Sequence, residues 1–414
     1  MTLTTARPCV TLWAMGDALS AKGLDRVRAV IGERVERGTL PGAVYALARR
    51  GEQHVEALGS QAADPGAGPM RNDTIFRISS ITKPIVAVAA MILVEEGRLR
   101  LDDPVDGLLP ELADRRVLTS LDASLDDTVP AGRPITVRDL LTFCMGFGIV
   151  LEAPGTYPIQ QAMEDLRLAQ GMPRPQVPPA PDEWMRNFGS LPLMRQPGEV
   201  FLYSTGADVL GVLIARVSGQ DLDRFLQERI FDPLGMVDTG FSVPTEKLAR
   251  FATSYLPDAA TGALDVYDPP DGQWSRPPAF PSGAGGLAST IGDVLAFAQM
   301  MLNLGRFDGE RILSSTTVQT MTTNQLTPEQ RDDPHNPILD GRGWGLGMSV
   351  IIIPDTIDGS VGAYGWDGGM GTSWRNDPAE DLVGILLSQL AWSTPDAIRL
   401  PRDFWTSVYA ALDD

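Results

Sequence analysis

The sequence predicts an α+β fold in which an antiparallel sheet is built from both ends of the chain, flanked by helices, with a mostly helical subdomain inserted between them. Strand-like segments lie near the two ends, whereas short helical segments joined by Pro- and Gly-containing loops fill the middle. A chain of 414 residues also exceeds the size at which a single core usually stops growing. We therefore expect a sheet subdomain formed by residues 1–78 plus 285–414 and a mostly helical subdomain formed by residues 79–284.

Helical and strand periodicity predict the individual elements. A first helix ends near residue 36, with Asp17 or Ser20 as its N-cap, and further helices are expected over 81–96, 136–143, 159–170, 206–217, 222–230, 291–304 and 395–412. Strands are expected over 42–49, 53–58, 76–78, 344–353, 361–366, 372–376 and 382–390. The helix over 81–96 is apolar on nearly all sides, so it should lie in the protein interior. The proline-rich segment 173–181 fits neither element and is expected to be a stiff surface excursion.

The composition argues against several classes of function. The formal net charge is −19, whereas nucleic-acid binding needs a surplus of Lys and Arg. The two cysteines offer neither a disulfide framework nor zinc-ligand spacing, and we expect no metal and no cofactor. The longest apolar run, residues 84–94, is much shorter than the roughly 18 residues that suggest a membrane span. No signal peptide is recognisable, so the expected location is the cytoplasm and the expected partner is a small molecule; the oligomeric state stays open.

The most informative local sequence is FRISSITKPIVAVAAMILVEEG, in which Ser80 lies three positions before Lys83 at the start of the apolar helix. Side chains at this spacing share one face of a helix. A serine hydroxyl becomes a good nucleophile when a neighbouring group accepts its proton, and an amine partly stripped of water has a lowered pKa and can do this. Ser80 at a helix N-terminus would also bring its own backbone N–H beside a developing oxyanion.

Lysine and histidine usage supports this interpretation. The only lysines are Lys22, Lys83 and Lys247, and arginine cannot supply a neutral base in a protein. A Ser-His-Asp triad is disfavoured, because His54 lies in an early strand, His335 lies in a polar loop, and no G-x-S-x-G elbow occurs. The alternative for Lys83 is a lysine that extends from a core helix to bring its amine to solvent.

The run from Ser80 to Lys83, SITK, resembles the S-x-x-K motif of the penicillin-recognising serine hydrolases, which include class C β-lactamases, DD-peptidases and family VIII carboxylesterases. Other segments resemble landmarks of this group in the same order: PGAVYALARRGE, LVEEGRLRLDDPV, ITVRDLLT, PGEVFLYSTGADVLGVLI, FDPLGMVDTGF, PSGAGGLASTIGDVLAFAQMMLNLG and YGWDGGMGTSW. The similarity runs from about residue 20 to 412. It implies a β-lactamase/transpeptidase-like fold with the active site at the interface of the two subdomains.

The resemblance also implies a role for Tyr203, which falls on the tyrosine of the second motif. In that group the phenol is held near the lysine ammonium, and this charge would lower the tyrosine pKa from about 10. Tyr203 would then share the proton of the nucleophile. The sequence leaves open whether Lys83 or Tyr203 is the base that activates Ser80.

The third motif falls on Trp366, Asp367 and Gly368, and Gly369 after it would lend a backbone N–H to an oxyanion hole shared with Ser80. β-Lactamases and DD-peptidases generally carry Lys or His, then Thr or Ser, then Gly at this motif, and the cation helps to hold the substrate carboxylate. An indole and a carboxylate would not attract such a group. They favour an uncharged acyl or alkoxy group in the substrate-binding site.

The second motif departs from the β-lactamase pattern as well, because Thr205 stands where Asn usually hydrogen-bonds an amide side chain. Both changes, together with the GWGLG segment 343–347, are similar to the family VIII esterases. We therefore expect a serine carboxylesterase that hydrolyses small carboxylic esters through an acyl-enzyme on Ser80. The alternatives are an acyltransferase, a weak β-lactamase or D-amino-acid peptidase on the same site, and a non-catalytic binding module with this fold. The long segment 152–195 is expected to line the acyl or alcohol pocket, with a surface excursion as its alternative.

Overall fold

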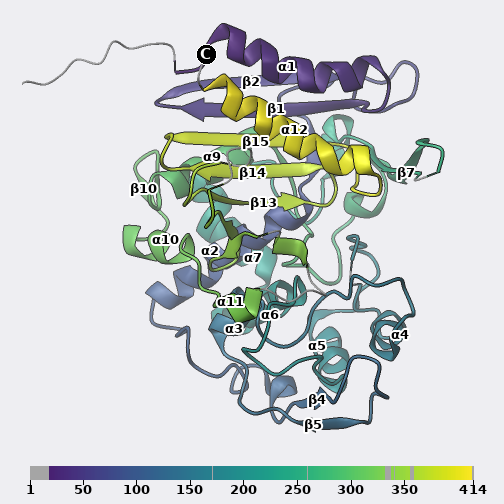
Figure 1. The fold of residues 1–414 in the computed structure, drawn as a ribbon, viewed down its shortest axis with the longest axis vertical. Coiled ribbons are helices and arrows are strands. Elements are labelled where there is room, and N and C mark those ends of the chain that lie inside the picture. Colours follow the sequence, from purple (N-terminus) through teal and green to yellow (C-terminus); the bar gives the residue numbers. More distant parts are fainter. Residues whose placement is uncertain are drawn as a thin grey trace, which may run out of the picture.

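The computed structural model describes residues 18–169, 171–258, 260–331, 337–339, 341–354 and 359–412. Its centre is a seven-stranded antiparallel sheet with the order β11-β12-β13-β14-β15-β1-β2 (Figure 1). The strands are β1 (Gly42–Arg49), β2 (Glu52–Gly59), β11 (Gly343–Trp344), β12 (Ser349–Val350), β13 (Tyr364–Gly368), β14 (Thr372–Asp377) and β15 (Leu382–Ser388). Both ends of the chain contribute to this sheet, which confirms the predicted α+β class.

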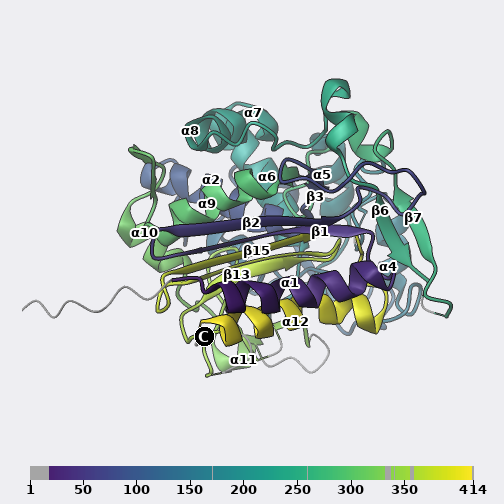
Figure 2. The ribbon, with the colours of Figure 1, turned by 90° about the horizontal axis from the view of Figure 1, so that it is seen from above.

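Two helices from opposite ends of the chain cover one face of the sheet. The first, α1 (Ala21–Glu36), begins after Ser20, whose side chain accepts a hydrogen bond from the N–H of Gly23. The second, α12 (Pro395–Ala411), packs beside it (Figure 2). Their apolar faces bury Val27, Phe404 and Trp405 in one cluster with side chains of β1 and β15. Both helices begin and end within a residue or two of their predicted positions.

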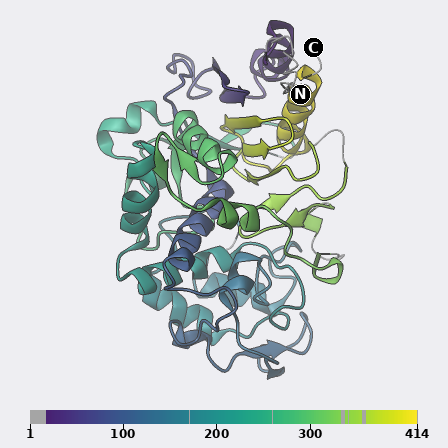
Figure 3. The same ribbon diagram turned by 90° about the vertical axis from the view of Figure 1, so that its left-hand side faces the viewer.

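The other face of the sheet is covered by α9 (Ile291–Leu302), and α2 (Thr82–Glu95) runs through the interior of the molecule. All residues of α2 from Thr82 to Leu93 are buried, as its all-round apolar sequence predicts. It packs against α6 (Thr205–Ser218). Three further helices, α3 (Val137–Leu141), α4 (Pro158–Asp165) and α5 (Pro181–Ser190), gather at the end of the molecule away from α1 and α12 (Figures 1 and 3). The remaining short helices are α7 (Leu222–Leu226), α8 (Asp232–Leu234), α10 (Ser315–Met321) and α11 (Pro328–Arg331).

In the described parts of the chain, four two-stranded sheets lie outside the central sheet, and the sequence predicted only one of their strands. They pair β3 (Ile75–Arg77) with β8 (Ala288–Thr290), β4 (Arg116–Leu118) with β5 (Thr128–Pro130), β6 (Ser254–Pro257) with β7 (Leu264–Asp268), and β9 (Arg306–Phe307) with β10 (Glu310–Arg311). Most of these strands have only two or three residues, too few for apolar alternation to be recognised. The single strand predicted over 344–353 is divided into β11 and β12, because Gly347 turns the chain with a φ of +92°.

The proline-rich segment 173–181 contains no regular element before α5, as predicted. Gln176 and Ala180 are exposed, as expected of a surface segment, but Pro175, Pro178 and Pro179 are buried, so one side of the segment packs against the molecule. Pro181 begins α5, because the first turn of a helix needs no intrahelical partner for its N–H groups. No helix in the described parts of the chain is long and apolar enough to cross a membrane. The subdomain boundaries at residues 78/79 and 284/285 stay a prediction.

Candidate active site

Ser80 lies in a single 3₁₀ turn, Ser79–Ile81, between β3 and α2. Ser79 directly before it has a φ of +47°, which is costly for a residue with a side chain. Ser204, the residue after Tyr203, has a φ of +102°. Strained residues therefore adjoin both the proposed nucleophile and the proposed tyrosine, and such strain persists where the surrounding structure holds a functional conformation.

Lys83 contacts Ser80 across one turn, as the spacing of the motif predicts. Its Nζ donates a hydrogen bond to Ser80 Oγ over 2.9 Å and another to the carbonyl oxygen of Ala284 over 2.5 Å. Lys83 is only 2% exposed, which argues against a lysine that brings its amine to solvent. Burial lowers the pKa of Lys83 to about 7, and the nearby Asp208 carboxylate raises it by less. An amine with this pKa can accept a proton from Ser80 near neutral pH.

Tyr203 lies two residues before the start of α6, and its ring faces the lysine. Lys83 Nζ is 4.5 Å from the centroid of the Tyr203 ring, and Tyr203 Oη accepts a hydrogen bond from Nε1 of Trp366 over 2.6 Å. Burial raises the pKa of Tyr203 above its usual value, while hydrogen bonds with Ser80 and Trp366 lower it by less. The prediction that the lysine charge lowers this pKa is therefore wrong, because the loss of solvent outweighs the neighbouring groups. The phenol keeps its proton at neutral pH.

The third motif lies on β13, the strand that contacts the turn containing Ser80. Thr372 donates a hydrogen bond from Oγ1 to the carbonyl oxygen of Ile78 over 3.0 Å and so ties the β13–β14 hairpin to that turn. A Cβ on Gly368 would lie 2.5 Å from the same carbonyl oxygen, so this close approach requires glycine. Gly369 follows at the end of the strand. Its role in an oxyanion hole with the N–H of Ser80 stays a proposal.

The other predicted substrate-binding residues differ in their surroundings. Trp366 faces Tyr203, whereas Asp367 accepts a hydrogen bond from Ser373 Oγ over 2.5 Å. Thr205 is the first residue of α6 and is fully buried. A direct contact between Thr205 and a substrate is therefore the least supported of the predicted roles.

Asp208 on α6 is a buried carboxylate that the sequence analysis missed. Its Oδ1 accepts hydrogen bonds from Ser282 Oγ over 2.7 Å and from the backbone N–H of Ala284 over 3.1 Å. The carbonyl oxygen of Ala284 accepts a hydrogen bond from Lys83 Nζ, so this residue bonds to both Asp208 and Lys83. Burial raises the pKa of Asp208, whereas these hydrogen bonds and the Lys83 charge lower it. The available signal was a single acidic residue in the apolar stretch TGADVLGVLI, which does not reveal its neighbour.

Arg342, directly before β11, is a second charged residue that the sequence analysis missed. Its Nη1 lies 3.6 Å from Asp367 Oδ2, and its Cζ lies 5.9 Å from the centroid of the Trp366 ring. Its Nε is buried without a hydrogen-bond partner in the described structure. A cation therefore lies beside the third motif, contrary to what Trp366 and Asp367 alone suggest, but a carboxylate of that motif compensates its charge.

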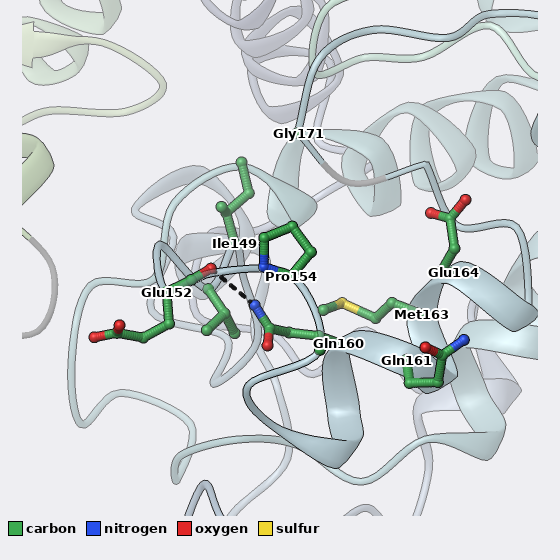
Figure 4. A pocket seen from close by; sticks show the side chains of 10 residues that line it. Ile149, Glu152, Pro154, Gln160, Gln161, Met163, Glu164 and Gly171 are labelled. Atoms are coloured by element: carbon green, nitrogen blue, oxygen red, sulfur yellow. Dashed lines mark hydrogen bonds between the residues drawn. The ribbon is translucent and has the colours of Figure 1, made fainter. Parts of the chain in front are cut away.

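A hollow of about 430 Å³ lies beside a segment that contacts the backbone of Tyr203 (Figure 4). Ile149 lines it and donates its backbone N–H to the carbonyl oxygen of Tyr203 over 2.7 Å. Much of the remaining lining, including Pro154 and Met163, comes from the segment 152–195. The role of this segment in binding substrate stays a prediction. Within the described residues, no group of three or more His, Cys, Asp and Glu side chains could hold a metal ion.

A serine in contact with a buried lysine, beside a buried tyrosine at the junction of an antiparallel sheet and helices, is typical of a serine hydrolase or acyltransferase. The chain belongs to the beta-lactamase family, whose model matches residues 27–403.

Similar proteins agree with this assignment. An uncharacterised protein of Mycobacterium tuberculosis is 39% identical over 375 residues, which cover 88% of this chain and 90% of the relative. Esterase EstB of Burkholderia gladioli is 31% identical over 389 residues, which cover 89% of this chain and 90% of the relative. The solved structure of EstCE1, "a hydrolase with promiscuous acyltransferase activity", has a TM-score of 0.76 at 26% identity and covers 94% of this chain and 98% of its own. The predicted family resemblance and fold are confirmed, and the chain is a serine hydrolase or acyltransferase of this family.

Proposed function

We propose that the protein is a carboxylesterase that hydrolyses small, uncharged carboxylic esters through an acyl-enzyme on Ser80. The observation that carries this proposal is the 2.9 Å contact between Lys83 Nζ and Ser80 Oγ, at a lysine whose burial lowers its pKa to about 7. A nucleophile and a base that is neutral near pH 7 are the minimum that acyl transfer to a serine needs. The similarity to Esterase EstB supports an ester as the substrate.

In the acylation step, the Ser80 oxygen attacks the ester carbonyl carbon while its proton passes to the Lys83 amine. The backbone N–H groups of Ser80 and Gly369 would stabilise the negative charge on the carbonyl oxygen. When this intermediate collapses, the bond to the alcohol oxygen breaks and Tyr203 donates its proton to that oxygen. The Lys83 ammonium then returns a proton to the Tyr203 phenolate, so both groups regain their starting states as the alcohol leaves.

In the deacylation step, a water molecule attacks the acyl carbon and gives a proton to the neutral Lys83 amine. The bond between the acyl carbon and Ser80 Oγ breaks, and the serine oxygen recovers a proton from the Lys83 ammonium. A carboxylic acid is released and the enzyme returns to its resting state. The raised pKa of Tyr203 and the lowered pKa of Lys83 support lysine as the base and tyrosine as the acid.

The charges at the third motif support an uncharged substrate. The Arg342 guanidinium lies 3.6 Å from the Asp367 carboxylate, so its charge is compensated at the place where β-lactamases hold a substrate carboxylate. A carboxylate approaching this pair would meet attraction from Arg342 and repulsion from Asp367 together.

The test is a parallel assay of p-nitrophenyl butyrate and a chromogenic cephalosporin on one preparation, with the Ser80→Ala variant as the blank. We expect kcat/KM for the ester to exceed that for the cephalosporin by about two orders of magnitude or more, the difference that a missing charge-assisted contact can produce. Equal or faster turnover of the cephalosporin would contradict the esterase proposal.

Acyl transfer is a second candidate, favoured by the similarity to the hydrolase with promiscuous acyltransferase activity. An alcohol that replaces water in deacylation would give a new ester instead of an acid. Adding a simple alcohol to the ester assay and measuring both products separates the two outcomes. A non-catalytic binding module would show no steady-state turnover with either acceptor.

A further inference from the structure

The 430 Å³ hollow is lined by two segments of the chain, one that contacts Tyr203 and one that leads toward the turn containing Ser80. On one side, Ile149 hydrogen-bonds to the carbonyl of Tyr203 over 2.7 Å, and a Cβ on Gly148 would lie 2.7 Å from the same oxygen. The chain before the hollow therefore runs directly against the backbone of the tyrosine. Ile149 also packs against the aromatic cluster that contains Tyr203 and Trp366.

On the other side, Gly171 lines the hollow, and the chain then runs to Pro173. A Cβ on Gly285 would lie 3.3 Å from Pro173 Cγ and 3.7 Å from the carbonyl carbon of Ser79. Tyr267 donates a hydrogen bond from Oη to the Pro173 carbonyl over 2.8 Å, which fixes this position. The hollow is thus lined by a chain segment that contacts Tyr203 at its start and approaches the turn containing Ser80 near its end.

The lining is mostly apolar, and its polar members are two glutamines and two glutamates. Ile149, Pro154 and Met163 supply apolar surface, and Figure 4 shows the side chains of Met163, Gln160 and Pro154 turned toward one another across the hollow. Glu152 and Glu164 supply carboxylates, of which Glu164 is paired with Arg174 over 2.7 Å. The described residues that line the hollow include no Lys, Arg or His. The volume of about 430 Å³ falls within the ~300–1,000 Å³ that small-molecule pockets usually have.

We propose that this hollow binds the alcohol portion of the ester and selects apolar alcohols that carry no negative charge. The inference rests on the proposed function, because it uses Tyr203 as the group that protonates the leaving oxygen. The substituent on that oxygen must extend on the tyrosine side of the reacting carbon. The hollow lies on that side, because its lining residue Ile149 contacts the Tyr203 backbone and packs against the aromatic cluster around the tyrosine. The acyl group, which stays on Ser80, extends elsewhere. An acyl acceptor would enter by the same space, because transfer is the reverse of acylation.

The size test compares two ratios of kcat/KM: benzyl acetate over ethyl acetate for the alcohol, and ethyl hexanoate over ethyl acetate for the acyl group. Met163→Trp fills the hollow, so the alcohol ratio should fall at least about tenfold, the scale on which a pocket discriminates by size. The acyl ratio should stay within about twofold of wild type, because both of its esters share the small ethyl group.

Gln161→Trp, at an exposed lining position, gives the same test if Met163→Trp lowers the melting temperature. The matched control is Ala279→Trp, which adds the same side chain to a different hollow, beside Val212 and Leu222, and should change neither ratio. A shift in the acyl ratio instead, or no shift in either ratio, overturns the proposal. If the wild type hydrolyses none of these esters, the proposed function has failed before the hollow is tested.

The charge test uses 4-(acetoxymethyl)benzoate and its methyl ester, which differ in a charge and a methyl group remote from the acetate ester. Release of acetate is measured, because the methyl ester contains a second ester bond. We expect the neutral ester to be preferred at least about tenfold, and Glu152→Gln to narrow that preference, more at low salt than at high salt. Equal turnover of the two esters by the wild type contradicts the predicted selection against negative charge.

Discussion

The indole N–H of Trp366 donates a hydrogen bond to the phenol oxygen of Tyr203 over 2.6 Å, which joins the third sequence motif to the second. The indole occupies one acceptor site of this oxygen, so the phenol proton is directed elsewhere, toward Ser80 or the leaving group. The two ring centroids are 5.5 Å apart, in a cluster that also contains Trp344. Trp366 stands where β-lactamases have a cation, and here it contacts the tyrosine. We infer that Trp366 orients the Tyr203 phenol.

Trp366→Phe should lower kcat for p-nitrophenyl butyrate about tenfold, because it removes one hydrogen bond of roughly 1–1.5 kcal/mol and keeps an aromatic ring. The matched control is Trp374→Phe. Trp374 on β14 is the cross-strand partner of Trp366 on β13, and it donates its indole N–H to Asn376. This control should lower the melting temperature without changing kcat. A Trp366→Phe enzyme with the kcat of wild type would show that the indole hydrogen bond has no part in catalysis.

Asp208→Asn should shift the pH dependence of the enzyme. The wild-type kcat/KM should rise with pH through about 7, as Lys83 loses its proton. The Asp208 carboxylate raises the Lys83 pKa, so its removal lowers that pKa and moves the rise to lower pH. The less basic amine should also reduce the maximum rate. The measurement is a pH–rate profile with an uncharged ester.

The control for this prediction is Asp293→Asn on α9. Asp293 is also buried and also accepts hydrogen bonds from a hydroxyl, that of Thr239, and from a backbone N–H, that of Asp238. Its replacement should affect stability and leave the pH profile in place. An unshifted profile in Asp208→Asn would mean that this carboxylate does not set the Lys83 pKa.

The elements with strong local signals were predictable from the sequence. β1 has the predicted bounds, and the Ser20 cap of α1 was among the two candidates, because apolar runs and N-caps depend on adjacent residues. The strands of β4–β5 and β6–β7 were not predictable, because each is held by its partner and packing rather than by its own pattern. The burial of Pro175 likewise depends on what packs over it.

The candidate site was predictable only as far as its motifs reach. Ser80 and Lys83 lie three positions apart, across the 3₁₀ turn that leads into α2, so their contact follows from their spacing. Asp208 and Arg342 gain their importance from neighbours on other elements, which no local pattern reveals. The direction of the Tyr203 pKa depends on complete burial, and a resemblance to a family does not predict how dry the site is.

Asp367→Asn should increase activity toward a carboxylate-bearing substrate. The change removes the negative charge 3.6 Å from Arg342 and leaves the guanidinium uncompensated beside the third motif. We expect kcat/KM for the chromogenic cephalosporin to rise about tenfold, the effect of one charge-assisted hydrogen bond, with less change for p-nitrophenyl butyrate. Adding Arg342→Gln should remove the gain. If the gain survives in the double variant, Arg342 is not the cation that holds the carboxylate.

Ser80, Lys83 and Tyr203 should behave as one unit, because each proton transfer in the proposed mechanism needs all three. Ser80→Ala should abolish acylation, and Lys83→Ala and Tyr203→Phe should each lower kcat at least about a hundredfold, the scale of general acid–base catalysis. Double variants should lose little more than the worse single variant, because residues that work together are strongly non-additive. Circular dichroism and melting temperature control for folding.

A fluorophosphonate ester should label the peptide containing Ser80 in the wild type and no peptide in Ser80→Ala. Labelling at Ser79 or Ser204, or near-normal turnover by Lys83→Ala, would show that the nucleophile or its base has been misassigned.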